Sequence, residues 1–357
     1  MPAARCDCAS GTLRLESRHM KNKGIGCIII FLAVALVLSL GFNLIQLIIN
    51  LDGSTAGVVE PKDRFSETLE QEGAKEAKDK IVRIDLEGMI ASGAGGSLLA
   101  EAGMNVDGVK RALEQAVSDK NVKAIVLLVN TPGGEVTASD TLYNAVKQAA
   151  AKKPVVVYMD SMAASGGYYL SCGATRIIAN ETTLTGSIGV IIQTLNYSET
   201  FGKVGLETLT FASGSFKDTL SGARPMREDE KAYVKGLVTQ MYDKFVGIVA
   251  DARKVNVDEL KNGVADGRVL TGREALANKL VDQVGYIEDA YSAARELGKA
   301  PDAMVVKYRH TPSFGDIFGF LGQAGTSQRT MKIDVSDRLL PRLDAGKAYL
   351  LPAHMVP

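Results

Sequence analysis

The alternation of apolar runs with helix-like stretches between residues 80 and 193 is the feature that most constrains the fold. Short runs rich in β-branched residues predict strands buried on both faces, and the stretches between them have helical periodicity. We expect strands near 81–86, 123–129, 154–159, 176–179 and 189–193, and helices near 107–118, 137–150 and 165–172. Strands and helices in this order predict an α/β fold with a mostly parallel sheet and right-handed crossovers.

The charge-free apolar run from Ile25 to Asn50 predicts one N-terminal transmembrane helix, because it exceeds the ~20 residues that a helix needs to cross a bilayer. Basic residues precede the run and acidic residues follow it: Arg5, Arg14, Arg18, Lys21 and Lys23 before, Asp52 and Glu60 after. The positive-inside rule then predicts a single-pass protein of the cell membrane, with its N-terminus in the cytoplasm and its large domain outside. A cleaved signal peptide is the alternative, but no Ala-x-Ala-like site follows the run.

Composition shifts divide the rest of the chain. Residues 64–79 are polar and charged, which is typical of a linker. Beyond the alternating block we expect helices near 227–252, 272–279 and 287–297 and a late strand near 304–308. The expected parts are a cytoplasmic segment (1–24), an anchor (25–50), a linker (51–79), an α/β domain (80–300) and a C-terminal extension (301–357).

Charge and cysteine content argue against several classes of function. The 41 basic and 41 acidic side chains balance, so the sequence gives no electrostatic argument for nucleic acid as a partner. Of the four cysteines only Cys172 lies in the expected α/β domain, which leaves no disulfide within it and no metal-ligand cluster. We therefore expect no cofactor and no metal, and we interpret Cys172 as a buried helix residue.

Ser165 stands among small residues, in the sequence 163–167 (AASGG), directly after an expected strand. Small neighbours permit a tight turn that presents a side chain at the start of a helix. A serine nucleophile needs a base, which is usually histidine. The three histidines lie before the apolar run or in the C-terminal tail: His19, His310 and His354. Lys217 is the remaining candidate for the base, although a solvated loop lysine is the ordinary interpretation.

A lysine serves as a base only in a special environment. A free lysine amine, with a pKa of ~10.4, is protonated at pH 7, and desolvation lowers the pKa by disfavouring the ammonium. Phe216 beside Lys217 is a candidate source of apolar surface. Asp218 would act in the opposite direction, so we expect its carboxylate to point away from the amine.

Three loops are expected to meet at the carboxyl ends of the strands, where parallel α/β sheets bind ligands: 130–134 (NTPGG), 165–166 and 185–189 (TGSIG). Acyl transfer needs N–H donors aimed at the developing oxyanion, and the backbones of Gly134 and Gly166 are candidates. Each glycine alone is also an ordinary turn former. The ordered combination of these loops with a loop lysine is more specific than any one of them.

This combination, with the N-terminal apolar run, resembles the signal peptide peptidase A family of ClpP/crotonase-like membrane serine proteases. The resemblance covers roughly residues 78–300 and includes one copy of the catalytic block, as in the shorter, single-unit form. It implies a repeated β-β-α superhelix. The implied roles are nucleophile for Ser165, general base for Lys217, oxyanion donors for Gly134 and Gly166, and orientation of the lysine amine for Ser187.

The resemblance implies a membrane-anchored serine endopeptidase that hydrolyses peptides outside the cytoplasm, remnant signal peptides among them. It also implies a homo-oligomeric ring that shields the sites beside the lipid bilayer. A membrane protease acting on a membrane partner protein is an alternative that would carry further transmembrane spans. A crotonase-type acyl-CoA enzyme would need no Ser–Lys pair, and a silent scaffold would keep the fold without a reactive serine.

Overall fold

The computed structural model describes residues 30–43, 65–74, 77–92, 106–309 and 349–350. The chain forms two units, Met1–Lys62 and Asp63–Pro357. In the first unit, residues 30–43 are helical and their side chains are exposed. Over the described ranges, no helix has the length and hydropathy of a membrane span. The remainder of the expected anchor, at 25–29 and 44–50, lies outside the described residues, and so does the expected segment 1–24.

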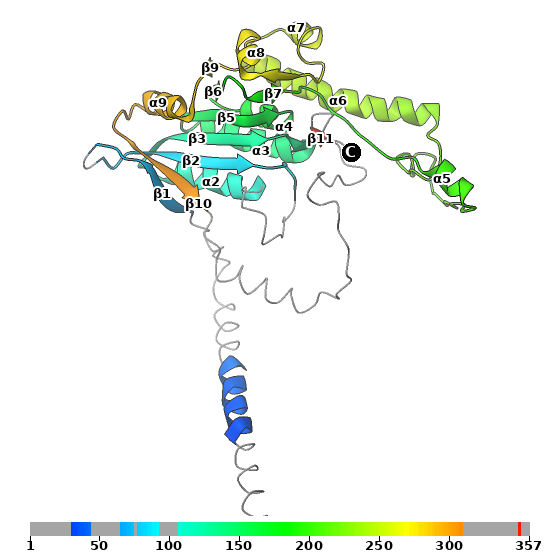
Figure 1. Cartoon of the computed structure of the whole chain (residues 1–357), viewed down its shortest axis with the longest axis horizontal. Helices are drawn as coiled ribbons and strands as arrows, with labels where there is room; N and C mark the ends of the chain where they lie inside the picture. Colours follow the sequence, from blue (N-terminus) through cyan, green and yellow to red (C-terminus); the bar gives the residue numbers. More distant parts are fainter. Residues whose placement is uncertain (1–29, 44–64, 75–76, 93–105, 310–348, 351–357) are drawn as a thin grey trace, which may run out of the picture. The chain divides into compact units, whose positions relative to one another are not determined.

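The second unit is built on a sheet of nine strands among the described residues, shown in Figure 1. Its path is β1-β10-β2-β3-β5-β6-β9, and β7 pairs with both β5 and β8. The bounds are β1 Ser66–Gln71, β2 Lys80–Glu87, β3 Val122–Thr131, β5 Val155–Ala164, β6 Arg176–Ala179, β7 Leu184–Gly186, β8 Val269–Thr271, β9 Gln283–Val284 and β10 Met304–Arg309. Pairs β1–β10 and β7–β8 are antiparallel, whereas the other pairs are parallel. The expected α/β fold with a mostly parallel sheet is confirmed.

Helices cover both faces of this sheet. The bounds of the helices described in this unit are α2 Val106–Ser118, α3 Val136–Ala150, α4 Gly166–Ser171, α5 Ser198–Lys203, α6 Glu228–Arg253, α7 Val257–Lys261, α8 Gly272–Ala277 and α9 Ile287–Leu297. Along β3, Ile125 and Leu127 face a core shared with α2 and α3, whereas Ala124 and Val126 face a core shared with α9. Burial on both sides explains why β3 is apolar at nearly every position.

Short strands form a second layer at the carboxyl end of the sheet. Strand β4 (Gly134–Glu135) follows β3 and precedes α3, so this stretch is a β-β-α unit. Ile90, which follows β2 in the same way, forms a parallel bridge to Gly134. Strand β11 (Tyr349–Leu350) pairs antiparallel with β4. β11 also contacts α3, although the two are far apart in the sequence, and Figure 1 shows it at that end of the sheet.

The sheet differs from the expected one in two places. It extends beyond the expected bounds of 80–300, because β1 from the expected linker pairs with β10 from the expected C-terminal extension. Most side chains of β1 are exposed, so its sequence lacks the apolar alternation that marks a strand. The expected strand at 189–193 does not form either. There Val190 is buried without strand pairing, and β7 takes the place beside β5.

Candidate active site

Ser165 occupies the junction between β5 and α4, with φ 54° and ψ −110°. A positive φ is strained for serine, at roughly 1–3 kcal/mol, and persists only where the surroundings impose it. Its N–H donates to the carbonyl of Gly186 at 2.8 Å, and its carbonyl accepts from the N–H of Tyr169 at 2.8 Å. The residue is fully buried, and within the described part of the chain its Oγ has no hydrogen-bond partner. A buried hydroxyl left unpaired at a strained strand-to-helix turn calls for a functional explanation.

The turn after Ser165 closes because residue 166 has no side chain. A Cβ on Gly166 would lie 2.4 Å from Ser139 Oγ and 3.2 Å from the backbone nitrogen of Gly134. These distances leave little room for a side chain at position 166. They also show that Gly134 and Gly166, the two expected oxyanion donors, lie side by side next to Ser165.

Gly134 is held as tightly as Gly166. A Cβ there would lie 1.9 Å from the carbonyl oxygen of Ile90, the residue that bridges to it. Before it, Gly133 has φ 109°, and its N–H donates to the hydroxyl of Thr131 at 3.1 Å. The loop after β3 is therefore fixed on both sides, which preorganises the backbone beside Ser165.

Ser187 lies next to Ser165 at the end of the neighbouring strand. Ala164 of β5 is paired with Gly186 of β7, so each serine directly follows a paired residue. Ser187 is buried with φ 49°, and its N–H donates to the carbonyl of Arg268 at 2.8 Å. The structure thus brings four of the five expected site residues together at the carboxyl ends of β3, β5 and β7.

Lys217 is not part of this group in the single chain. It lies in the loop between α5 and α6, is exposed, and its N–H donates to the carbonyl of Gly214 at 3.1 Å. Because Ser165 Oγ has no partner, the two side chains make no hydrogen bond. Figure 1 shows α5 and its adjoining loop beyond the end of the sheet.

Asp218 is bound by a guanidinium. Arg224 donates from Nε to Asp218 Oδ2 at 2.9 Å and from Nη2 to Oδ1 at 2.8 Å. These hydrogen bonds lower the pKa of the Asp218 carboxyl below its usual value. The carboxylate that would oppose a neutral lysine therefore has a partner of its own.

Sequence reasoning missed Arg224 and its second partner, Glu230. Glu230 is fully buried at the start of α6 and accepts from the backbone N–H of Arg227 at 2.9 Å. The sequence signal was an acidic residue at the third position of a helix, which is the position of a capping-box glutamate.

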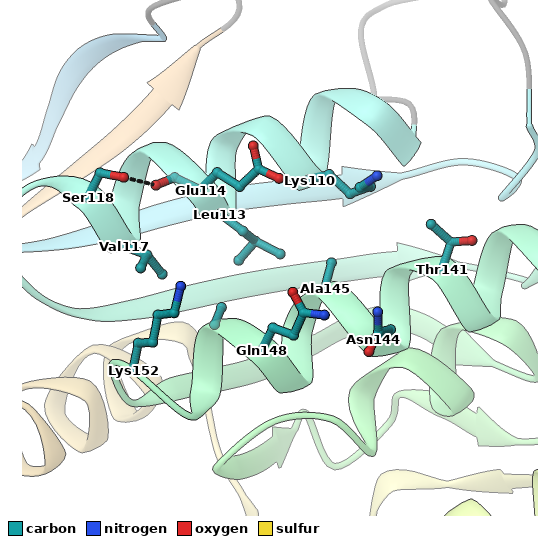
Figure 2. A pocket seen from close by; sticks show the side chains of 11 residues that line it. Lys110, Leu113, Glu114, Val117, Ser118, Thr141, Asn144, Ala145, Gln148 and Lys152 are labelled. Carbon is teal, nitrogen blue, oxygen red and sulfur yellow. Dashed lines mark hydrogen bonds between the residues drawn. The ribbon is translucent and has the colours of Figure 1, made fainter.

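Two other features near the sheet do not supply a nucleophile or a base. Burial raises the pKa of the Cys172 thiol to about 12, so it stays protonated at neutral pH. A cavity of about 350 Å³ lies between α2 and α3, with Lys110, Glu114, Asn144 and Lys152 among its lining residues, and Figure 2 shows their side chains. None of the expected site residues lines it.

A strained, buried serine that lies beside the backbones of two glycines, at the end of a parallel sheet, is typical of hydrolases that attack with a serine hydroxyl. Sequence comparison supplies the family. The model of Peptidase family S49 matches residues 147–300. A putative signal peptide peptidase SppA from Enterococcus faecium is 38% identical over 277 residues, which cover 77% of this chain and 78% of that protein. The chain belongs to peptidase family S49, as the resemblance to signal peptide peptidase A predicted.

The comparisons also match a longer protease and, more weakly, a solved structure. Protease 4 from Salmonella typhi is 36% identical over 232 residues, which cover 64% of this chain and 37% of that longer protein. A solved structure of a ClpP1 mutant from Listeria monocytogenes aligns with a TM-score of 0.40 and 17% identity, covering 58% of this chain and 93% of that chain.

Proposed function

We propose that this peptidase is a membrane-anchored serine endopeptidase of ClpP/crotonase-like fold, with Ser165 as nucleophile and Lys217 as general base. The observation that carries the proposal is the unpaired, buried Oγ of Ser165 beside the backbones of Gly134 and Gly166. In the reaction, Oγ attacks the peptide carbonyl while the lysine amine accepts its proton. The N–H groups of both glycines stabilise the oxyanion, and Ser187 orients the amine.

The pairing of β4 with β11 supports an extended peptide as the substrate. Tyr349 and Leu350 run antiparallel to Glu135 and Gly134, so the edge of β4 accepts an extended chain next to an oxyanion donor. Adding a strand to an exposed edge is a common way to bind peptides independently of most side chains. This observation favours a peptide over an acyl-CoA, whose phosphates call for basic residues.

Exposed apolar side chains around Lys217 support the proposal of a homo-oligomeric ring. The segment from residue 195 to residue 216, which includes α5, exposes Leu195, Val204, Leu206, Leu209, Phe211 and Phe216, and Phe211 is 95% exposed. Clustered apolar exposure of this kind marks contact surfaces. Contact with a second copy would cover this loop and remove water from Lys217, which is the environment that a lysine base needs.

The location is proposed from the sequence. Residues 25–50 anchor the protein, with the N-terminus in the cytoplasm and the peptidase unit outside, and the substrates are remnant signal peptides or similar apolar peptides. A reporter fused after residue 60 tests the topology. Reporter activity outside the cytoplasm is expected, and activity inside would overturn the orientation.

Hydrolysis of an internally quenched apolar peptide tests the function. Full-length protein in detergent is expected to cleave the peptide, Ser165→Ala is expected to lose cleavage, and neither is expected to turn over an acyl-CoA. Cleavage by Ser165→Ala at the wild-type rate, or turnover of the acyl-CoA alone, would refute the proposal.

A further inference from the structure

The loop that carries Lys217 is fastened to the start of α6 by one guanidinium. Arg224 binds Asp218 through Nε and Nη2, as described above. It also donates from Nη1 to Glu230 Oε2 at 2.8 Å and from Nη2 to Glu230 Oε1 at 2.6 Å. Arg224 therefore bridges the residue next to Lys217 and the first turn of a long helix.

Glu230 anchors the other end of this bridge. Its side chain is fully buried, and an isolated buried carboxylate is costly unless it is paired and hydrogen-bonded. The hydroxyl of Thr219 lies 3.3 Å from Glu230 Oε1 and 2.8 Å from the carbonyl oxygen of Phe216. The network thus holds the backbone on both sides of Lys217.

The aromatic side chain before Lys217 is fixed to the same helix. The Phe216 ring packs edge-on against Tyr233 of α6, with ring centroids 5.4 Å apart. Arg227 lies over the Phe216 ring, 5.6 Å from its centroid, and donates from Nη2 to the carbonyl of Ser215 at 3.0 Å. The residues on either side of Lys217, from 215 to 219, all make hydrogen bonds or ring contacts. The Lys217 ammonium, in contrast, makes no hydrogen bond or ion pair within the described part of the chain.

We propose that Arg224 and Glu230 are positioning residues for Lys217: they fix its loop, and Arg224 holds the Asp218 carboxylate away from the lysine amine. The inference rests on the proposed role of Lys217 as general base. A carboxylate beside an amine stabilises its protonated form, so a free Asp218 would keep the base charged. Because both Asp218 oxygens are bound to Arg224, the carboxylate is not available to stabilise the protonated amine of Lys217.

The test uses a double variant, Arg224→Gln/Glu230→Gln, which removes both charges and leaves no unpaired charge in the buried position. We expect the pH midpoint of kcat/KM to rise by about one unit, because Asp218 is released, and kcat/KM at pH 7 to fall about tenfold. Adding Asp218→Asn to the double variant is expected to restore the wild-type midpoint. Arg176→Gln, which breaks the exposed pair with Glu296, is the control and should leave the profile unchanged.

A role confined to folding would lower the melting temperature of the double variant without moving the pH midpoint, and Asp218→Asn would not restore activity. That result would overturn the inference. If the double variant does not fold, Arg224→Lys is measured in its place. This variant keeps the positive charge but loses the bidentate hydrogen bonds to Asp218. A wild-type pH profile for Arg224→Lys would also overturn the inference. Full activity of Lys217→Ala would instead refute the proposed function itself, so the two failures are distinguishable.

Discussion

The N–H of Ser165 donates to the carbonyl of Gly186 at 2.8 Å, and this bond joins the ends of two parallel strands at the point where both turn. The next residue on the second strand is Ser187, and both serines have positive φ, 54° and 49°. Strained backbone at two adjacent strand ends is characteristic of preorganised sites, because the surrounding pairing has to impose it. Four candidate residues are placed by this scaffold before any substrate binds.

The strain at Ser165 predicts a difference between two inactive variants. Ser165→Gly relieves the positive φ and Ser165→Ala does not, so the glycine variant should be about 1 kcal/mol more stable toward urea. Both should lack peptidase activity. A glycine variant less stable than the alanine variant would contradict the account of the turn.

Gly134→Ala should damage both stability and activity. The added Cβ meets the carbonyl oxygen of Ile90 at 1.9 Å, so the backbone must shift, at a cost of about 2–3 kcal/mol. Gly236→Ala on α6, where nothing lies within 4 Å of the new Cβ, is the matched control and should gain about 1 kcal/mol. Urea unfolding and peptide cleavage measure both, and equal effects at the two glycines would be inconsistent with this prediction.

Acid should weaken the hydrogen bonds between Arg224 and Glu230 that hold the Lys217 loop against α6. Hydrogen bonds from Arg224 lower the pKa of Glu230 from 4.5 to about 2. Since the folded pKa lies below the unfolded one, ionised Glu230 stabilises the fold fully above the unfolded value and loses this effect as the pH falls toward 2. The melting-temperature difference between wild type and Glu230→Gln should be constant above about pH 5 and narrow below it. A difference that widens on acidification would count against the network.

The assembly proposal predicts that residues 52–357 form a homo-oligomer in light scattering. Phe211→Ser should shift the population toward smaller species, because it removes the most exposed aromatic ring of the segment 195–216. A monodisperse monomer for the wild-type unit at working concentration would contradict the ring.

Local sequence signals predicted the elements that build the core and failed where structure depends on distant partners. The apolar runs around Ile125 and Val156 identified β3 and β5, since burial on both faces leaves a continuous apolar pattern. The turn glycines likewise indicated where Ser165, Gly134 and Ser187 meet. Strand β1 was not predictable, because it is a polar edge strand defined only by its partner β10.

The path of the Lys217 loop had no local signal either. Residues 195–216 are no more apolar than the chain as a whole, and they lie mostly exposed in the single chain. The bridge from Asp218 through Arg224 to Glu230 joins charges whose pairing follows from the fold, and the sequence shows only that they are near one another.

Labelling with a fluorophosphonate probe tests the central claim most directly, because the probe reacts only with an activated serine. Wild-type protein should be labelled, with Ser165 as the modified residue by peptide mapping. Ser165→Ala and Lys217→Ala should both lose labelling while keeping the wild-type fold, and Lys203→Ala, on neighbouring α5, should keep it. Labelling of Lys217→Ala at the wild-type rate, or modification of another serine, would contradict the assignment.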